Sequence, residues 1–388
     1  MTLITTAPLP APSRLVGLLG RAATEDWILA GPWLRAGDSP IWFSRAAWAL
    51  EAVAASWSAH HGRPATLWFP DYFCNQSTWP VRRGGARLQF YPITPNLGPD
   101  WETCERLAAL APPDFFVQVH YFGFAADMSE ARRFCDSNDA LLIEDAAHVM
   151  APAGDIGRWG DMVIHSPYKH LPVPDAGLLV MRPSMPSSVR PTQASLPGAA
   201  PSPAAWIAKR LVQVALSRVI RRPLARPRRG FADDPATVPL PPTPSLSAAG
   251  RRLLAATLPD LPALAERKRR NERAVRRALA AAPGLAPLNS EPGETTVPYR
   301  AVFRADDPEC AARWYEILCR ARVPVETWPD LPPEIFAEPD RHAAALELRS
   351  CILLLANNAS ATPHQLERIY GDTVASAASA IAARRARA

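Results

Sequence analysis

Long apolar runs are missing from this 388-residue sequence, and no stretch of about 18 apolar residues could form a membrane-spanning helix. The first residues also lack the basic leader and apolar core of a secretory signal. Six cysteines are scattered without CxxC or CxxH spacing, which argues against a zinc site and a disulfide scaffold. We therefore expect a soluble protein of the reducing cytoplasm, with no metal.

Acidic residues are absent from residues 206–230, where much of the net charge of +6 is concentrated. A helix is expected in this basic stretch, with an apolar side made of Leu211, Val212, Ala215, Leu216 and Val219. Two interpretations stay open. The helix packs on its own chain or on a dimer mate, or the stretch is drawn to anionic phosphates of a nucleotide-sugar or a membrane surface. No zinc finger, RNP-like segment or basic zipper occurs, so nucleic-acid binding is not expected.

Short apolar segments alternate with helical patterns through the first half of the chain. Strands are expected at 65–70, 86–93, 114–123, 140–145, 161–166 and 176–182. Helices are expected within 43–62 and over 129–139. The alternation predicts an α/β fold whose mostly parallel sheet is covered by helices on both faces.

Proline, serine and alanine dominate residues 183–250, which we interpret as an insertion or linker. Helical and strand patterns resume after it: helices at 261–284, 310–321 and around 362–372, and strands at 297–305, 323–329 and 350–356. They predict a small C-terminal α+β domain. The expected division is a large domain over 1–250 and a small one over 251–388.

A carboxylate and a lysine follow two of the predicted strands. Asp145 ends the strand 140–145, and Lys169, in a chain with few lysines, follows the strand 161–166. Parallel sheets collect ligands at the carboxyl ends of their strands. A lysine whose pKa is lowered by burial can form an imine with an aldehyde. Pyridoxal 5′-phosphate requires both groups, because its aldehyde condenses with a lysine and its ring nitrogen must stay protonated.

Six motifs occur in one order along the chain: FSRAAWAL, LWFPDYFC, VHYFGFAADM, IEDAAH, AGDIGRWGD and SPYKHLPVPDAGLLV. Together they resemble the DegT-type sugar aminotransferases over roughly residues 40–182. These are fold-type I pyridoxal-phosphate enzymes, so the resemblance implies a seven-stranded type of sheet in the large domain and a homodimer. Three features depart from the family pattern: a shortened S-x-x-K motif, PDAG in place of a Gly-Glu-Gly-Gly turn, and Arg45 where a small residue is frequent.

The resemblance also implies roles for individual residues. Lys169 would be the Schiff-base lysine and proton shuttle, Asp145 the partner of the pyridine nitrogen, and His148 a partner of the phenolic oxygen or a border of the substrate site. The phosphate would be held by Ser166, by the loop from Ser44 to Ala47, which includes Arg45 and Ala46, and by a further contact from Ser77. The aromatic ring over the cofactor would be Tyr72 or Phe73. His120 either faces the substrate or is a satisfied core histidine.

We expect an aminotransferase that moves an amino group from glutamate or glutamine to a nucleotide-linked keto-sugar in polysaccharide or glycoconjugate biosynthesis. Two alternatives stay open. One is another pyridoxal-dependent reaction, such as dehydration or C–N bond formation. The sugar 3-dehydratases of the family commonly have a histidine at the position of the lysine, and His170 lies directly beside Lys169. The other is a non-catalytic scaffold of the same fold.

Overall fold

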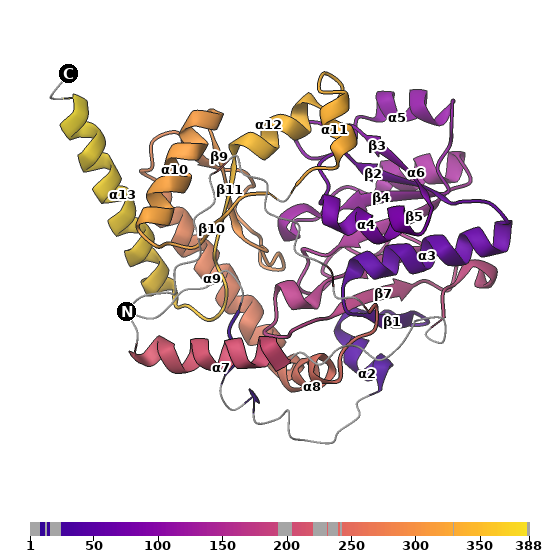
Figure 1. Ribbon diagram of the computed structural model, residues 1–388, viewed down its shortest axis with the longest axis horizontal. Coiled ribbons are helices and arrows are strands. Elements are labelled where there is room, and N and C mark those ends of the chain that lie inside the picture. Colours follow the sequence, from indigo (N-terminus) through magenta and orange to yellow (C-terminus); the bar gives the residue numbers. More distant parts are fainter. Residues whose placement is uncertain are drawn as a thin grey trace.

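The computed structural model describes residues 8–11, 14–15, 25–192, 204–219, 231, 240, 243–328 and 330–385, with side chains left out for 214–219 and 378–385. Two sheets organise these residues (Figure 1). The strands of the larger sheet lie before residue 182, and those of the smaller sheet lie after residue 284. The expected division at about residue 250 falls between them and stays a prediction.

The larger sheet has seven strands in the order β1-β7-β6-β5-β4-β2-β3. Strands β3, β2, β4, β5 and β6 are parallel, whereas β7 is antiparallel to both of its neighbours. This confirms the predicted α/β class with a mostly parallel, seven-stranded sheet. The strands are β1 (Ser39–Phe43), β2 (Thr66–Pro70), β3 (Arg87–Tyr91), β4 (Phe115–Val119), β5 (Leu141–Ala146), β6 (Met162–His165) and β7 (Gly177–Met181).

Both faces of this sheet are buried under helices. Alternation along β7 shows it: Leu179 and Met181 enter one apolar cluster with α3, while Leu178 and Val180 enter a second cluster on the other face. The covering helices are α2 (Asp26–Ala30), α3 (Ala46–His61), α4 (Asn75–Arg83), α5 (Trp101–Ala108) and α6 (Ser129–Ser137). Short 3₁₀ turns occur at η2 (Gly31–Trp33), η3 (Tyr121–Gly123), η4 (Pro167–Lys169) and η5 (Ser187–Val189).

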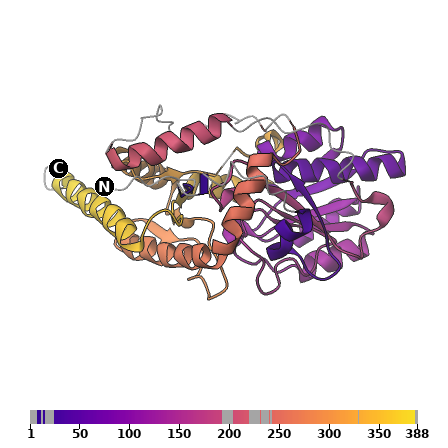
Figure 2. The ribbon, with the colours of Figure 1, turned by 90° about the horizontal axis from the view of Figure 1, so that it is seen from below.

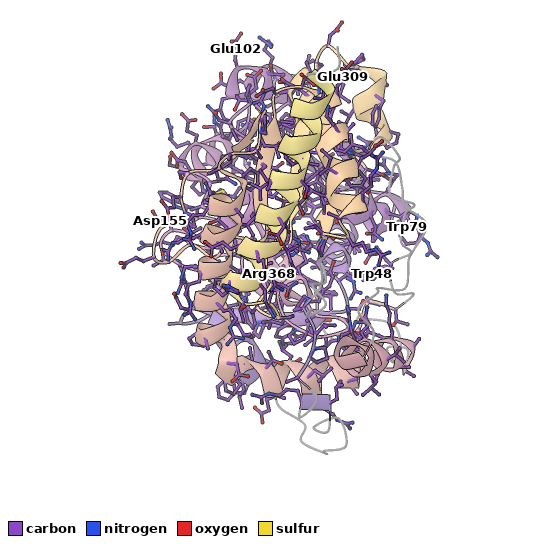
Figure 3. All side chains as sticks on the ribbon, turned by 90° about the vertical axis from the view of Figure 1, so that its left-hand side faces the viewer. Trp48, Trp79, Glu102, Asp155, Glu309 and Arg368 are labelled. Atoms are coloured by element: carbon purple, nitrogen blue, oxygen red, sulfur yellow. The ribbon has the colours of Figure 1, made fainter. Side chains whose placement is uncertain are left out.

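The smaller sheet is antiparallel, in the order β10-β11-β9-β8. Its strands are β8 (Leu285–Pro287), β9 (Ala301–Ala305), β10 (Val325–Glu326) and β11 (Ile352–Leu355). Helix α13 packs along α9 at the outer side of this part, as seen from below in Figure 2, and it lies lengthwise at the front of the molecule in Figure 3. The helices are α8 (Ala248–Thr257), η7 (Leu258–Asp260), α9 (Leu261–Leu279), α10 (Pro308–Arg320), α11 (Pro333–Ala337), α12 (Ala343–Cys351) and α13 (Pro363–Arg385).

Several elements differ from the sequence-based expectation. Strand β1 and helices α2, α4, α5, α8, α11 and α12 were not predicted, and the strand expected over 323–329 is only the two-residue β10. Helix α4 contains Pro80, which removes a backbone donor and hides the helical pattern. Strand β1 is short, and its pairing with β7 comes from distant sequence.

Helix α7 (Ala204–Val219) contains the first part of the basic stretch. The side chains of Leu211 and Val212 are 50% and 49% exposed, so the interpretation that this side packs on its own chain is wrong for these two residues. Residues 220–230 of the stretch lie outside the described part, so its proposed contacts with a dimer mate or with phosphates stay predictions. Within the described ranges, no helix has the length and apolar character needed to cross a membrane.

Candidate active site

Strand β5 places two neighbouring carboxylates on opposite sides of the centre of the larger sheet. Asp145 is 6% exposed, and its Oδ1 accepts a hydrogen bond from the Ala147 amide at 2.8 Å. Burial raises the pKa of the Asp145 carboxyl, while the charge of Lys169 opposes the rise. A cation beside Asp145 therefore favours its ionised form.

The other carboxylate, Glu144, is fully buried and holds the loop between β5 and β6. Its two oxygens accept the backbone N–H groups of Gly157, Trp159 and Gly160 at 2.6–2.7 Å. A fourth donor is His120 Nε2, at 2.9 Å, whose Nδ1 accepts the Ala126 amide. His120 is thus a satisfied core histidine, which resolves the two interpretations left open for it.

Lys169 lies in the turn that follows β6, in η4, where its amide donates to the Ser166 carbonyl at 2.9 Å. Its Nζ lies 5.8 Å from the centre of the Tyr299 ring. Burial acts to lower the pKa of Lys169, as expected for a buried lysine, but electrostatic interactions with Tyr168, Tyr299 and Asp145 outweigh it, and the net shift of the pKa is upward. The Nζ must give up a proton before it can attack an aldehyde.

Asp145 and Lys169 line one pocket of about 620 Å³, its open mouth included. Eight of the ten predicted site residues line it: Arg45, Ala46, Phe73, Ser77, Asp145, His148, Ser166 and Lys169.

The other two predicted residues do not line the pocket. Ser44 directs its hydroxyl to the Thr243 carbonyl at 2.8 Å and its amide to the Pro244 carbonyl, so neither donor is left for a phosphate. Tyr72 is fully buried behind the wall and stacks on Trp328, with ring centres 4.3 Å apart. Of the two aromatic candidates, the structure brings Phe73 to the pocket.

Two helices begin at the pocket. Ala46 and Ala47 start α3, and Ser77 lies in the first turn of α4. Neither helix has a side chain capping its first turn, so backbone N–H groups are left for an anion. Gly177 lets β7 come close to this corner, because a Cβ there would lie 2.4 Å from the Ala46 nitrogen.

The three departures from the family pattern are connected in space. The Arg45 guanidinium lies over the Tyr168 ring, 4.1 Å from its centre, and donates to the Pro174 carbonyl at 3.2 Å. Asp175, in the PDAG turn, accepts the Ser247 hydroxyl at 2.8 Å where α8 begins. Arg45 therefore clamps the shortened lysine turn from one side, and Asp175 anchors it from the other.

The sequence did not indicate Tyr168, Leu240 or Trp328, which also line the pocket. Tyr168 lies inside the SPYKHL motif, directly before the lysine, and its position was the available signal. Trp328 and Leu240 come from distant segments without a motif. Their placement depends on packing between the two halves of the chain.

The residues of the pocket fit pyridoxal 5′-phosphate. Two uncapped helix starts, Arg45, Ser77 and Ser166 suit the phosphate, whereas Asp145 suits a cationic ring nitrogen and Lys169 an aldehyde. Among the described residues, no group of three or more histidine, cysteine, aspartate or glutamate side chains could hold a metal.

Residues 86–185 match the DegT/DnrJ/EryC1/StrS aminotransferase family. The match confirms the predicted resemblance, and with it the predicted aminotransferase class and pyridoxal-phosphate cofactor. Asp145, His148, Ser166 and Lys169 lie inside the matched segment, whereas the phosphate loop at 44–47 lies before it. Among curated proteins, none matches the sequence significantly.

Solved structures share the fold at low sequence identity. The aminotransferase TlmJ from Streptoalloteichus hindustanus is 18% identical with a TM-score of 0.64, and the alignment covers 96% of this chain and 93% of that one. Helicobacter pylori PseC, an aminotransferase of pseudoaminic acid biosynthesis, is 11% identical with a TM-score of 0.68, covering 97% and 100%. DesI, solved with its TDP-sugar product, is 17% identical with a TM-score of 0.67, covering 96% and 92%.

Proposed function

We propose that this chain transfers an amino group from glutamate or glutamine to a nucleotide-linked keto-sugar. Its residues 86–185 match the DegT/DnrJ/EryC1/StrS aminotransferase family. It acts as a cytoplasmic homodimer in polysaccharide or glycoconjugate assembly. One observation carries the proposal: adjacent strands deliver Asp145 and Lys169 to a single pocket that ends at two uncapped helix starts.

Pyridoxal 5′-phosphate, when bound, supplies an electrophilic aldehyde and an electron-withdrawing ring. Lys169 Nζ would hold the aldehyde, Asp145 the protonated ring nitrogen, and Ser77, Ser166 and the amides of Ala46 and Ala47 the phosphate. Phe73 would lie along the ring face. These positions follow from which residues line the pocket.

Lys169 has the second task of moving a proton. Its Nζ would act as the general base that removes the proton from the α-carbon of the amino donor, and then as the general acid that returns a proton to the reacting atoms. Asp145 would keep the ring nitrogen protonated, because a buried carboxylate and a cation opposite it stabilise each other. Positioned proton transfer of this kind is worth about 10²–10⁴-fold in rate.

The sugar substrate is supported by two structural relatives. PseC is an aminotransferase involved in the biosynthesis of pseudoaminic acid, and DesI was solved with its TDP-sugar product. Arg45 lines the pocket, and its guanidinium would attract the anionic phosphate groups of a nucleotide-linked sugar.

The half-reaction with glutamate tests the proposal. Glutamate added to the cofactor-loaded protein should abolish the visible absorbance and release 2-oxoglutarate, and a nucleotide-linked keto-sugar should restore the absorbance. The Lys169→Ala variant should show neither the loss nor the return of absorbance. Lys209 lies on α7 and does not line the pocket, so Lys209→Ala serves as the matched control. Release of water or of a dehydrated sugar without 2-oxoglutarate would instead favour the dehydration alternative, and a protein that binds no cofactor would favour a scaffold.

The proposed homodimer has its own test in light scattering of the purified chain. Trp79, 45% exposed and edge-on to Trp48, stands at the side of the molecule (Figure 3). A mass of one chain at micromolar concentration would contradict the dimer.

A further inference from the structure

Two aromatic rings lie parallel to the His148 ring. The Tyr299 ring lies with its centre 4.5 Å from that of His148, at an interplanar angle of 5°. The Phe122 ring lies at 5.9 Å and 12°, and the Arg300 guanidinium lies over the Tyr299 ring, 4.1 Å from its centre. The imidazole is therefore held in one plane by residues from both halves of the chain.

The backbone of Phe122 fixes which nitrogen of His148 carries the proton. The Phe122 amide donates to His148 Nδ1 at 3.3 Å, so Nδ1 is the acceptor and the proton of the neutral ring belongs on Nε2. Phe122 has a φ of 57°, a left-handed conformation that is unusual for a bulky residue. Its carbonyl accepts the Tyr299 amide at 2.7 Å, so one strained residue binds both partners of the stack.

Gly123 makes this arrangement possible. It has a φ of 91°, and a Cβ there would lie 2.6 Å from the Val297 carbonyl oxygen and 2.9 Å from the His148 carbonyl oxygen. The chain at 122–123 is thus wedged between His148 and the segment 297–299. Backbone strain of this kind persists only where the surroundings enforce it.

The surroundings of His148 favour the neutral ring. Burial lowers the pKa of His148 well below its ordinary value, and the positive charges of Lys169 and Arg300 lower it further. The ring lines the pocket and has its Nδ1 occupied. It can offer a ligand one proton donor, and it has no free lone pair for accepting a proton.

We propose that His148 acts as a fixed Nε2–H donor to an oxygen of the cofactor and carries no proton during the reaction, and that Phe122 and Tyr299 are its positioning residues. The inference rests on the proposed function for the identity of the ligand. The tautomer of His148, and the contacts with Phe122 and Tyr299 that fix it, are properties of the chain without any ligand.

The tautomer is measured directly by ¹⁵N NMR of histidine-labelled full-length protein without cofactor. The His148 resonance, assigned by its loss in His148→Gln, should show a proton on Nε2 and none on Nδ1. A proton on Nδ1, or rapid exchange between the two nitrogens, would overturn the proposal. Because this measurement needs no cofactor, it stays decisive if the proposed function fails.

Two pairs of variants test the roles. Gln can place an amide N–H near the position of Nε2, so His148→Gln should keep kcat/KM within about tenfold of the parent, whereas a proton carrier would lose about 10²–10⁴-fold in both His148→Gln and His148→Ala. Tyr299→Phe keeps the ring and should keep the NMR signature, whereas Tyr299→Leu should weaken cofactor affinity by about 2- to 10-fold, the contribution of an aromatic pair. Equal behaviour of Phe and Leu at position 299 would contradict the positioning role.

Discussion

Glu144 is the residue whose replacement should most clearly affect the architecture behind the site. Its side chain is fully buried and accepts four hydrogen bonds: three from the loop at 157–160 and one from His120. Glu144→Gln keeps the shape but turns one acceptor oxygen into an NH₂ group that faces two donors. About two hydrogen bonds to a charged acceptor are lost, each worth about 1.5–3 kcal/mol, so unfolding should become easier by about 3–6 kcal/mol.

Denaturant unfolding followed by tryptophan fluorescence measures this loss. Glu102→Gln is the matched control, because the Glu102 side chain is 83% exposed at the edge of the molecule (Figure 3). The control should change the free energy of unfolding by less than about 0.5 kcal/mol. Equal stabilities of the two variants would refute the role assigned to Glu144.

The pH dependence gives an independent check on Glu144. Burial acts to raise its pKa, but the hydrogen bonds from His120 and the loop outweigh burial, and the pKa lies below the ordinary value of 4.5. The folded protein therefore binds this proton less readily than the unfolded chain. The stability that Glu144 contributes is complete above about pH 4.5 and is lost as the pH falls through the folded-state pKa. The gap in stability between the parent and Glu144→Gln should narrow in acid, and a gap that widens would contradict the assigned pKa direction.

Three further predictions concern the corner of the pocket assigned to the phosphate. Ser77→Ala should weaken pyridoxal-phosphate affinity, measured by fluorescence titration, by about 2- to 10-fold, which is the contribution of one hydrogen bond. Ser44→Ala should leave this affinity unchanged, because the Ser44 hydroxyl donates to the Thr243 carbonyl. Equal losses of affinity in the two variants would contradict this assignment. Arg45→Ala removes the cation over Tyr168 and the bond to Pro174, and should weaken the same affinity at least tenfold, with Arg63→Ala as a control of exposed charge. Gly177→Ala forces a Cβ against the start of α3 and should lower the free energy of unfolding by about 1–3 kcal/mol; an unchanged thermal midpoint would contradict the close approach.

Local patterns in the sequence were enough to predict most of the larger sheet. The buried strands β2 to β7 are recognisable in the sequence as apolar runs between turns. Asp145 lies at the carboxyl end of one of them, which predicts a ligand site at that edge of the sheet. The family resemblance then supplied roles for Lys169 and Asp145 that spacing alone could not. The pocket brings these two together, as expected.

Long-range packing decided what the sequence could not show. Ser44 looked available for a phosphate, but a segment 200 residues away in sequence takes both of its donors. Tyr72 and Phe73 are adjacent, and only the path of the chain after β2 decides which one reaches the pocket. Tyr299 approaches from the C-terminal half without any motif, so its stack on His148 could not be anticipated.

The central claim is that Lys169 forms the covalent bond to pyridoxal 5′-phosphate, and a trapping experiment tests it most directly. The chain has only two other lysines, Lys209 on α7 and Lys268, whose Nζ is buried against the Tyr299 carbonyl and Asn357. Borohydride reduction of the loaded protein, followed by peptide mass spectrometry, should find the reduced cofactor on Lys169 and on no other residue, and Lys169→Ala should remain unlabelled. Label on Lys268 or Lys209, or equal labelling of Lys169→Ala, would contradict the account.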